Sequence, residues 1–269
     1  MHLKRLITAL VLLPFLILLI LKGGALPFSI LIATVSLIAL REFFRIMLGE
    51  GGSRHVLSCA FIFAPAIVFS AHYDMPELML MLVALGTMAA GVLSLSRYGK
   101  DAGVIEAVPV AVLGLVYIPV FLSYLVFLRG GSGSPDGVAW VFMLLLLVGA
   151  GDTGAFYTGT YFGKHKLCPS ISPKKTVEGF AGGLATAVLL GTVFKLMFLP
   201  DLPLGRGILL FVAVGIAGPL GDLFESVLKR RGCIKDSGSL LPGHGGMLDR
   251  IDALLFAAPV AWLFKAYIV

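Results

Sequence analysis

Two short stretches near the C-terminal end of the chain combine carboxylates with basic groups at helical spacing. Asp222, Ser226 and Lys229 stand at positions i, i+4 and i+7, so on a helix they share one face. Asp249 and Asp252 are at i and i+3 and share a face in the next apolar segment. Magnesium binds carboxylates and phosphate oxygens, while lysine and arginine hold the remaining phosphate charge. These residues therefore predict a metal–polyphosphate site.

A structural role is the alternative for each carboxylate. An ion pair that joins two helices would explain Asp222 or Asp249 alone, but the convergence of several carboxylates favours a ligand role. Asp152, in GAGDTGAFYTG, either belongs to the site or marks a helix-packing stretch of small residues. Glu225 is expected to lie off the Asp222 face and to be structural or a partner in helix–helix contact.

Other candidate groups lie in polar segments. Lys174 and Lys175 either bind an anion or act only as positive charges that orient the chain in a membrane. Glycines on both sides of His244 free the backbone to approach a ligand, although an ordinary loop histidine is the alternative.

The composition indicates which kind of fold must position these groups. The chain has 269 residues, of which 58% are hydrophobic and 13% charged, and its mean hydropathy is +1.00. Soluble domains contain about 25% charged residues. A water-soluble fold is therefore excluded, and we expect an all-α, polytopic integral membrane protein. The net charge of +6 suits an anionic membrane face or an anionic ligand.

Apolar runs of about 20 residues indicate membrane-spanning helices, and about nine such runs are present. The predicted spans lie near residues 6–21, 25–40, 56–71, 77–96, 103–128, 138–161, 179–199, 206–228 and 249–268. Residues 1–130 are expected to form about five helices without chemistry. Residues 131–269 are expected to form the catalytic region, with polar cytoplasmic loops at 162–178 and 229–248.

The distribution of basic residues predicts an orientation. If the N-terminus is cytoplasmic, most of the 21 lysines and arginines face the cytoplasm. Both polar loops then lie on that side, and carboxylates from three helices reach the same depth. With its short loops and no targeting extension, the chain is expected in a bacterial inner membrane, with its active site facing the cytoplasm.

Residues 226–252 read SVLKRRGCIKDSGSLLPGHGGMLDRID and form a dense pattern of mixed chemistry. The pattern consists of Ser226, Leu228, Lys229, Arg230, Lys235, Asp236, Pro242, His244, Gly245, Gly246, Asp249, Arg250, Ile251 and Asp252. It resembles the signature of the phosphatidate cytidylyltransferase family, whose members make CDP-diacylglycerol. GDTGAFYTGTYFGKHK and SPKKTVEG are similar to that family's middle region.

The resemblance implies that CTP and phosphatidic acid react to give CDP-diacylglycerol and pyrophosphate. The expected catalytic residues are Asp222, Ser226, Lys229, Arg230, Asp249 and Asp252. The expected substrate-binding residues are Lys174, Lys175, His244, Gly245, Gly246, Arg250 and Asp152. Asp222 and Asp249 are expected to hold Mg²⁺, with room for a second cation, divalent or monovalent, that shares Asp249.

Three other functions fit parts of the pattern. A polyprenol kinase or an ether-lipid cytidylyltransferase would also use CTP on a lipid, and a cation-coupled transporter would use intramembrane carboxylates. The transporter would be expected to show paired broken helices in symmetric halves, which the sequence does not reveal. The expected partners are CTP, phosphatidic acid and the lipid bilayer, with no nucleic acid. Faces of small residues allow a homodimer without requiring one.

Overall fold

The computed structural model describes residues 2–49, 53–101, 103–130, 136–238 and 245–269, most of them helical. The chain divides into two compact units. Unit 1 comprises residues 1–133 and 228–250, and unit 2 comprises residues 134–227 and 251–269. Unit 1 therefore contains the N-terminal helices together with most of the signature segment.

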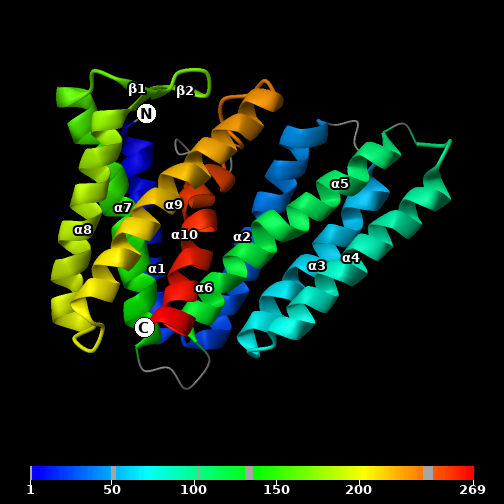
Figure 1. Cartoon of the computed structure of the whole chain (residues 1–269). Coiled ribbons are helices and arrows are strands. Elements are labelled where there is room, and N and C mark those ends of the chain that lie inside the picture. The colour runs from blue at the N-terminus through cyan, green and yellow to red at the C-terminus, as the bar shows by residue number, and fades with distance from the viewer. Residues whose placement is uncertain (1, 50–52, 102, 131–135, 239–244) are drawn as a thin grey trace. The chain divides into compact units, whose positions relative to one another are not determined.

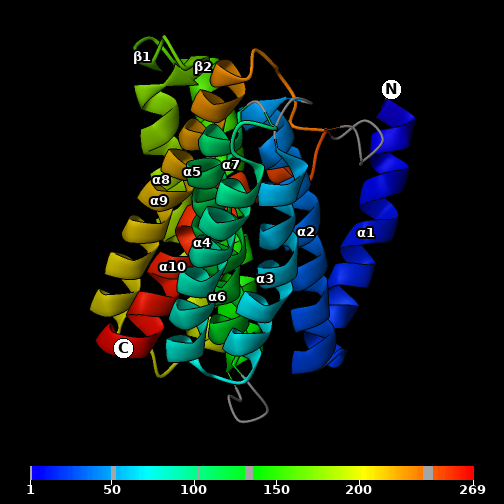
Figure 2. The same ribbon diagram turned by 90° about the vertical axis from the view of Figure 1, so that its right-hand side faces the viewer.

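Unit 1 is built from the N-terminal helices. They are α1 (His2–Lys22), α2 (Ala25–Leu48), α3 (Arg54–His72), α4 (Pro76–Arg97), α5 (Val104–Leu115) and α6 (Phe121–Arg129), with the π-helical turn η1 (Val116–Val120) between the last two. Figure 2 shows α2, α3 and α4 side by side. Leu40 and Phe43 of α2 are fully buried in the core. A Cβ on Gly114 would lie 2.7 Å from a ring carbon of Phe44, so glycine lets α5 approach α2 closely.

Unit 2 contains two complete helices and the greater part of two others. Its elements are α7 (Gly137–Phe162), β1 (Lys166–Cys168), β2 (Ser172–Thr176), α8 (Val177–Phe198), most of α9 (Leu204–Arg231), most of α10 (Leu248–Leu263) and η2 (Phe264–Ile268). The two strands form an antiparallel hairpin at one end of α7 and α8 (Figure 1). The segment predicted as the polar loop 162–178 therefore contains a small sheet.

Helices α7 and α8 pack closely because glycines line their contact. A Cβ on Gly183 would lie 2.6 Å from the carbonyl oxygen of Gly151, and one on Gly182 would collide with Thr158. Small residues are typical of membrane helices whose backbones approach one another. This contact fixes α7 against the helix that follows the hairpin.

We expect the Gly183→Ala substitution to destabilise unit 2 by about 1–3 kcal/mol, because the carbonyl of Gly151 cannot move without a shift of α7. The measurement is the melting temperature of the purified protein in detergent. Gly149→Ala in α7 is the matched control, since its Cβ would meet no atom within 4 Å. Equal melting temperatures for the two variants would contradict the close packing.

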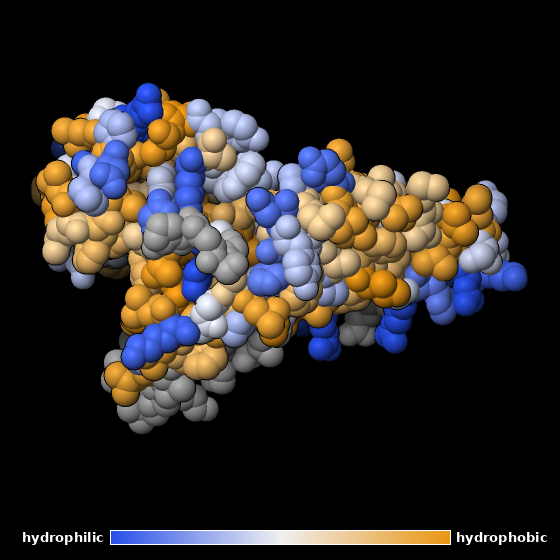
Figure 3. Space-filling view, turned by 90° about the horizontal axis from the view of Figure 1, so that it is seen from below, coloured by the Kyte–Doolittle hydropathy of each residue, from blue (hydrophilic) through white to orange (hydrophobic). Residues whose placement is uncertain are grey.

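Seven helical segments in the described part of the chain are long and apolar enough to cross a membrane. They are Arg54–His72, Pro76–Arg97, Val104–Arg129, Gly137–Phe162, Val177–Phe198, Leu204–Arg231 and Leu248–Ile268. Each coincides with a predicted span, and the first two predicted spans fall within α1 and α2. Large exposed apolar side chains include Leu80, Met88 and Leu95 of α4. Hydrophobic groups also cover much of the surface seen in Figure 3. The prediction of an all-α, polytopic membrane protein is confirmed.

Candidate active site

Unit 2 contains a partly open cavity of about 520 Å³ lined by α7, α8, α9 and the hairpin. Its charged lining residues are Asp152, Lys166, Lys174, Lys175 and Asp222. The rest of the lining is mainly glycine and apolar side chains, including Phe156, Phe180 and Pro219. A volume of this size suits a small ligand. The lysines make the cavity suitable for an anion, and its walls provide apolar contact.

Lys175 and Asp222 form the central ion pair of this cavity. The Nζ atom of Lys175 lies 2.6 Å from an oxygen of Asp222, and both side chains are partly exposed. Lys175 comes from β2, whereas Asp222 comes from α9. The predicted basic segment and the first predicted acidic face therefore meet in unit 2.

The hairpin that carries Lys175 is fastened to the start of α8. The Thr176 side chain accepts a hydrogen bond from the backbone N–H of Gly179 and caps the helix, as threonine commonly does. The Glu178 carboxylate accepts hydrogen bonds from the backbone N–H groups of Lys164, at 3.0 Å, and of His165, at 3.1 Å. These contacts hold both ends of the hairpin and so position Lys175.

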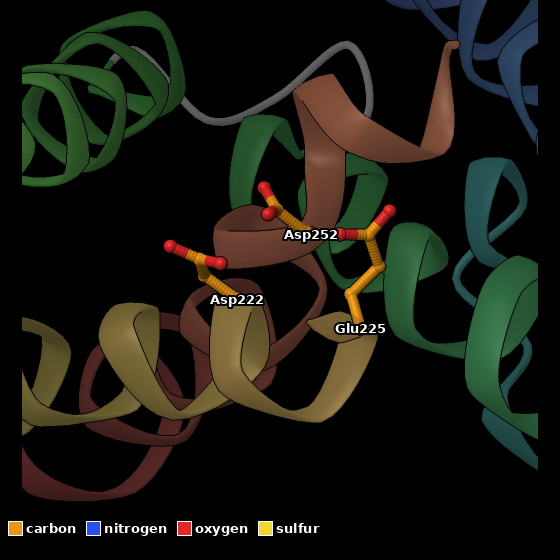
Figure 4. Close-up of side chains that lie close together, drawn as sticks. All are labelled: Asp222, Glu225 and Asp252. Atoms are coloured by element: carbon orange, nitrogen blue, oxygen red, sulfur yellow. The ribbon is translucent and has the colours of Figure 1, made fainter. Parts of the chain in front are cut away.

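Asp222 also belongs to a group of three carboxylates. One oxygen from each of Asp222, Glu225 and Asp252 lies within 4.8 Å of the others. Figure 4 shows Asp222 and Glu225 on α9 and Asp252 on α10, with the three side chains close together. Asp222 and Asp252 are partly exposed, whereas Glu225 is fully buried. Oxygen ligands at this spacing fit a hard divalent cation such as magnesium or calcium.

Three other predicted residues contact Asp222 or line the same cavity. The Ser226 hydroxyl donates to Asp222 Oδ1 across 3.4 Å, which places these two side chains on one helix face as predicted. Asp152 of α7 lines the cavity together with Asp222. Lys174 lines the same cavity and is exposed.

In unit 1, Asp249 lies in a different set of contacts. One of its oxygens accepts a hydrogen bond from Lys229 Nζ at 2.8 Å. The other accepts from the backbone N–H groups of Ser237, at 3.0 Å, and Gly246, at 2.8 Å. Both members of the Lys229–Asp249 pair are largely buried, with 17% and 9% of their side chains exposed. Two residues predicted to be catalytic thus form an ion pair that is also bound to the backbone.

The glycines of the signature have identifiable backbone roles. Gly245 has a φ of 81°, a left-handed conformation that glycine adopts without strain. Gly246 donates to Asp249, and any side chain there would collide with Ser237. His244 lies outside the described residues. Arg230 and Arg250 are exposed.

The structure identifies two acidic residues that sequence reasoning missed or assigned differently. Glu225 was expected to lie off the Asp222 face, but positions i and i+3 of a helix differ by only about 60° in direction, so its carboxylate joins the cluster. Glu42 of α2 was not predicted at all, because residues 1–130 were expected to carry no chemistry. Its buried carboxylate accepts hydrogen bonds from Ser237, Met247 and Leu248.

Comparison with known proteins shows a similarity that extends over nearly the full length of this chain. The model of the cytidylyltransferase family matches residues 3–268. The chain belongs to the cytidylyltransferase family. It is therefore an enzyme of the nucleotidyltransferase class.

Several relatives of this cytidylyltransferase share one name. The phosphatidate cytidylyltransferase of Bacillus subtilis (strain 168) is 34% identical over 247 residues, which cover 90% of each chain. The Staphylococcus saprophyticus enzyme of the same name is 34% identical over 260 residues, or 95% of this chain and 96% of its own. The Mycobacterium bovis enzyme is 44% identical over 151 residues, or 55% of this chain and 47% of its own.

We expect the Lys175→Ala substitution to lower the catalytic efficiency of this cytidylyltransferase about tenfold or more, because it removes the cation paired with Asp222. Lys174→Ala is the matched control from the same strand, where the exposed side chain should matter less. The measurement is initial rate against CTP concentration. A larger loss for the Lys174 variant would contradict the assignment of the central cation to Lys175.

Proposed function

We propose that the chain is a phosphatidate cytidylyltransferase that converts CTP and phosphatidate into CDP-diacylglycerol and pyrophosphate. The observation that carries this proposal is the similarity to enzymes of that name over 90–96% of both chains. The cavity supports it independently, because lysines and an ion-paired aspartate stand beside apolar walls. Such a lining suits a phosphate group joined to a lipid or to a nucleoside.

Bond formation and cleavage follow from the substrates. An oxygen of the phosphatidate phosphate attacks the α-phosphorus of CTP in line, and the bond from that phosphorus to the bridging oxygen breaks. The electron pair leaves with pyrophosphate. The attacking phosphate is already largely ionised near neutral pH, so no strong general base is required. Catalysis then depends mainly on positioning and on compensating negative charge.

We assign the cation-binding role in unit 2 to the acidic cluster. Asp222, Glu225 and Asp252 would hold Mg²⁺. A bound Mg²⁺ ion would neutralise phosphate charge as the bond to pyrophosphate breaks. Asp249 remains a predicted ligand, with a second cation beside it, and its described partners are Lys229 and two backbone amides.

The basic and polar residues of the chain would bind the phosphates. Lys175, with Lys174, would hold one phosphate group at the cavity, and Ser226 would donate its hydroxyl to a phosphate oxygen. In unit 1, Lys229 and Arg230 would hold the lipid phosphate or the triphosphate. His244, Gly245, Gly246 and Arg250 remain predicted substrate contacts, and Asp152 a predicted wall of the site.

The apolar helices support a place in a lipid bilayer, where phosphatidate resides. We further propose a bacterial inner membrane with the N-terminus and the active site on the cytoplasmic side, since CTP is a cytoplasmic nucleotide. A homodimer is compatible with the small-residue helix faces. Fusing reporter domains to the loop at 162–178 and to the C-terminus would test the orientation.

The experiment that tests the proposed function measures pyrophosphate release from CTP by the purified protein in detergent, with and without phosphatidate. We expect release that depends on the lipid and saturates with its concentration. An ether-linked phosphatidate tests the ether-lipid activity by the same pyrophosphate release. Undecaprenol tests the kinase activity by the formation of CDP, because a kinase transfers the γ-phosphate of CTP and releases CDP. Release that is independent of any lipid would contradict the proposal.

A further inference from the structure

Glu42 is a buried carboxylate in the C-terminal part of α2. Only 7% of the surface of Glu42 is exposed. A buried charge is costly unless hydrogen-bond donors surround it. One carboxylate oxygen accepts from the backbone N–H of Met247 at 3.0 Å, and the other accepts from that of Leu248 at 2.8 Å. Glu42 thus binds backbone donors at the start of α10, which lack partners within the helix.

The same carboxylate also binds the segment that follows α9. The Ser237 hydroxyl donates to Glu42 Oε2 at 3.0 Å. Arg45, one turn further along α2, donates from Nη2 to the carbonyl oxygen of Ser237 at 2.5 Å. A side chain on Gly238 or Gly246 would collide with Glu42 or its partners, so glycine permits this close approach. Two residues of α2 therefore fix Ser237 through both its side chain and its backbone.

Ser237 connects Glu42 to the Lys229–Asp249 pair. Its hydroxyl is bound to Glu42, while its backbone N–H donates to Asp249 at 3.0 Å. Asp249 in turn accepts from Lys229 at 2.8 Å. All of these residues belong to unit 1. The result is a continuous chain of contacts from α2 to Lys229.

We propose that Glu42, assisted by Arg45, is a positioning residue that holds the Lys229–Asp249 pair in place through Ser237. The proposal rests on the proposed function, since that function gives Lys229 a phosphate to bind. Glu42 acts through Ser237 and not by contact with substrate. A misplacement of about 1 Å in a reacting constellation can cost about 100-fold in rate, so a defect in this support should be measurable.

The first test replaces Glu42 with glutamine. Glutamine keeps the shape of the side chain, but its amide nitrogen would face N–H or O–H donors instead of accepting from them. We expect about a tenfold rise in the KM for one anionic substrate, CTP or phosphatidate, with the other KM within about twofold of wild type. The substrate that responds is the one held by Lys229. Glu106→Gln, at an exposed glutamate of α5, is the control and should leave both values unchanged.

A second variant tests the proposal where the fold is less at risk. Arg45 is exposed, so Arg45→Ala should fold normally while it releases the Ser237 carbonyl. We expect about a threefold rise in the same KM, since one hydrogen bond to Ser237 is lost. Arg41→Ala, at an exposed arginine one turn earlier on α2, is the matched control.

A third readout does not need catalysis. Hydrogen–deuterium exchange should be faster in Glu42→Gln for peptides that cover residues 245–249, with α3 and α4 unchanged, because the glutamine amide nitrogen cannot accept from one of the Met247 and Leu248 N–H groups. Unchanged exchange, or unchanged kinetics, would overturn the positioning role. An equal loss in both KM values and kcat with a lowered melting temperature would also overturn it. If the wild-type protein has no lipid-dependent activity while Glu42→Gln still exchanges faster than wild type, the proposed function is refuted and the positioning contact is not.

Discussion

Asp222→Asn is expected to reduce CTP-dependent synthesis of CDP-diacylglycerol about 100-fold or more, with a normal amount of protein in the membrane. Asp222 contributes to both described features of unit 2, the ion pair with Lys175 and the cluster with Glu225 and Asp252. Asparagine keeps the shape but removes the charge. The substitution therefore removes the ion pair with Lys175 and weakens the only group of three carboxylates found among the described residues.

The effect of Asp222→Asn is measured as turnover in detergent at saturating CTP and phosphatidate. Asp201→Asn provides the control, because Asp201 is exposed between α8 and α9. Raising the Mg²⁺ concentration should restore part of the activity if the lost charge weakens cation binding. Near-wild-type turnover of Asp222→Asn without a raised Mg²⁺ concentration would contradict the assignment of Asp222 to the active site.

Lys229→Ala is expected to lower turnover about 100-fold and the free energy of unfolding by about 3 kcal/mol. Two causes act together. The variant loses a cation that is proposed to bind a phosphate, and it leaves the Asp249 carboxylate buried without its ion-pair partner. The loss of stability should lie at the low end for a broken buried pair, because two backbone amides still bind Asp249.

Turnover and thermal unfolding of the same preparation separate the two effects of Lys229→Ala. Lys235→Ala, at an exposed lysine of the same segment, is the matched control and should change neither quantity. The double variant Lys229→Met, Asp249→Leu should recover stability but not activity, since it removes both charges at once. Recovery of activity in that variant would show that the pair is only structural.

Features that depend on local spacing could be predicted from the sequence. Asp222 and Ser226 share a helix face, as their separation of four residues requires, and their side chains are in contact. The apolar runs predicted the spanning helices, because a segment that crosses a bilayer must satisfy its own backbone hydrogen bonds. The sequence positions of the glycines in α7 and α8 did not predict which atoms of the neighbouring helix each glycine contacts.

Features that depend on contacts between distant segments could not be predicted. Glu42 stands about 200 residues before Met247, and no spacing rule relates them. The pairing of Lys175 with Asp222 likewise needed the hairpin, which the sequence suggested only as a polar loop. Asp249 was predicted from its spacing to Asp252, but the Ser237 N–H that donates to it stands twelve residues earlier, and no helix spacing relates the two.

The most direct test of the proposed reaction uses the purified protein, phosphatidate, and CTP that is radiolabelled at either the α- or the γ-phosphate. A cytidylyltransferase should place the α-label in the lipid product and release the γ-label as pyrophosphate, in equal amounts. Transfer of the γ-label to the lipid would contradict this account and indicate a CTP-dependent kinase. A lipid that carries no label with either form of labelled CTP would also contradict this account.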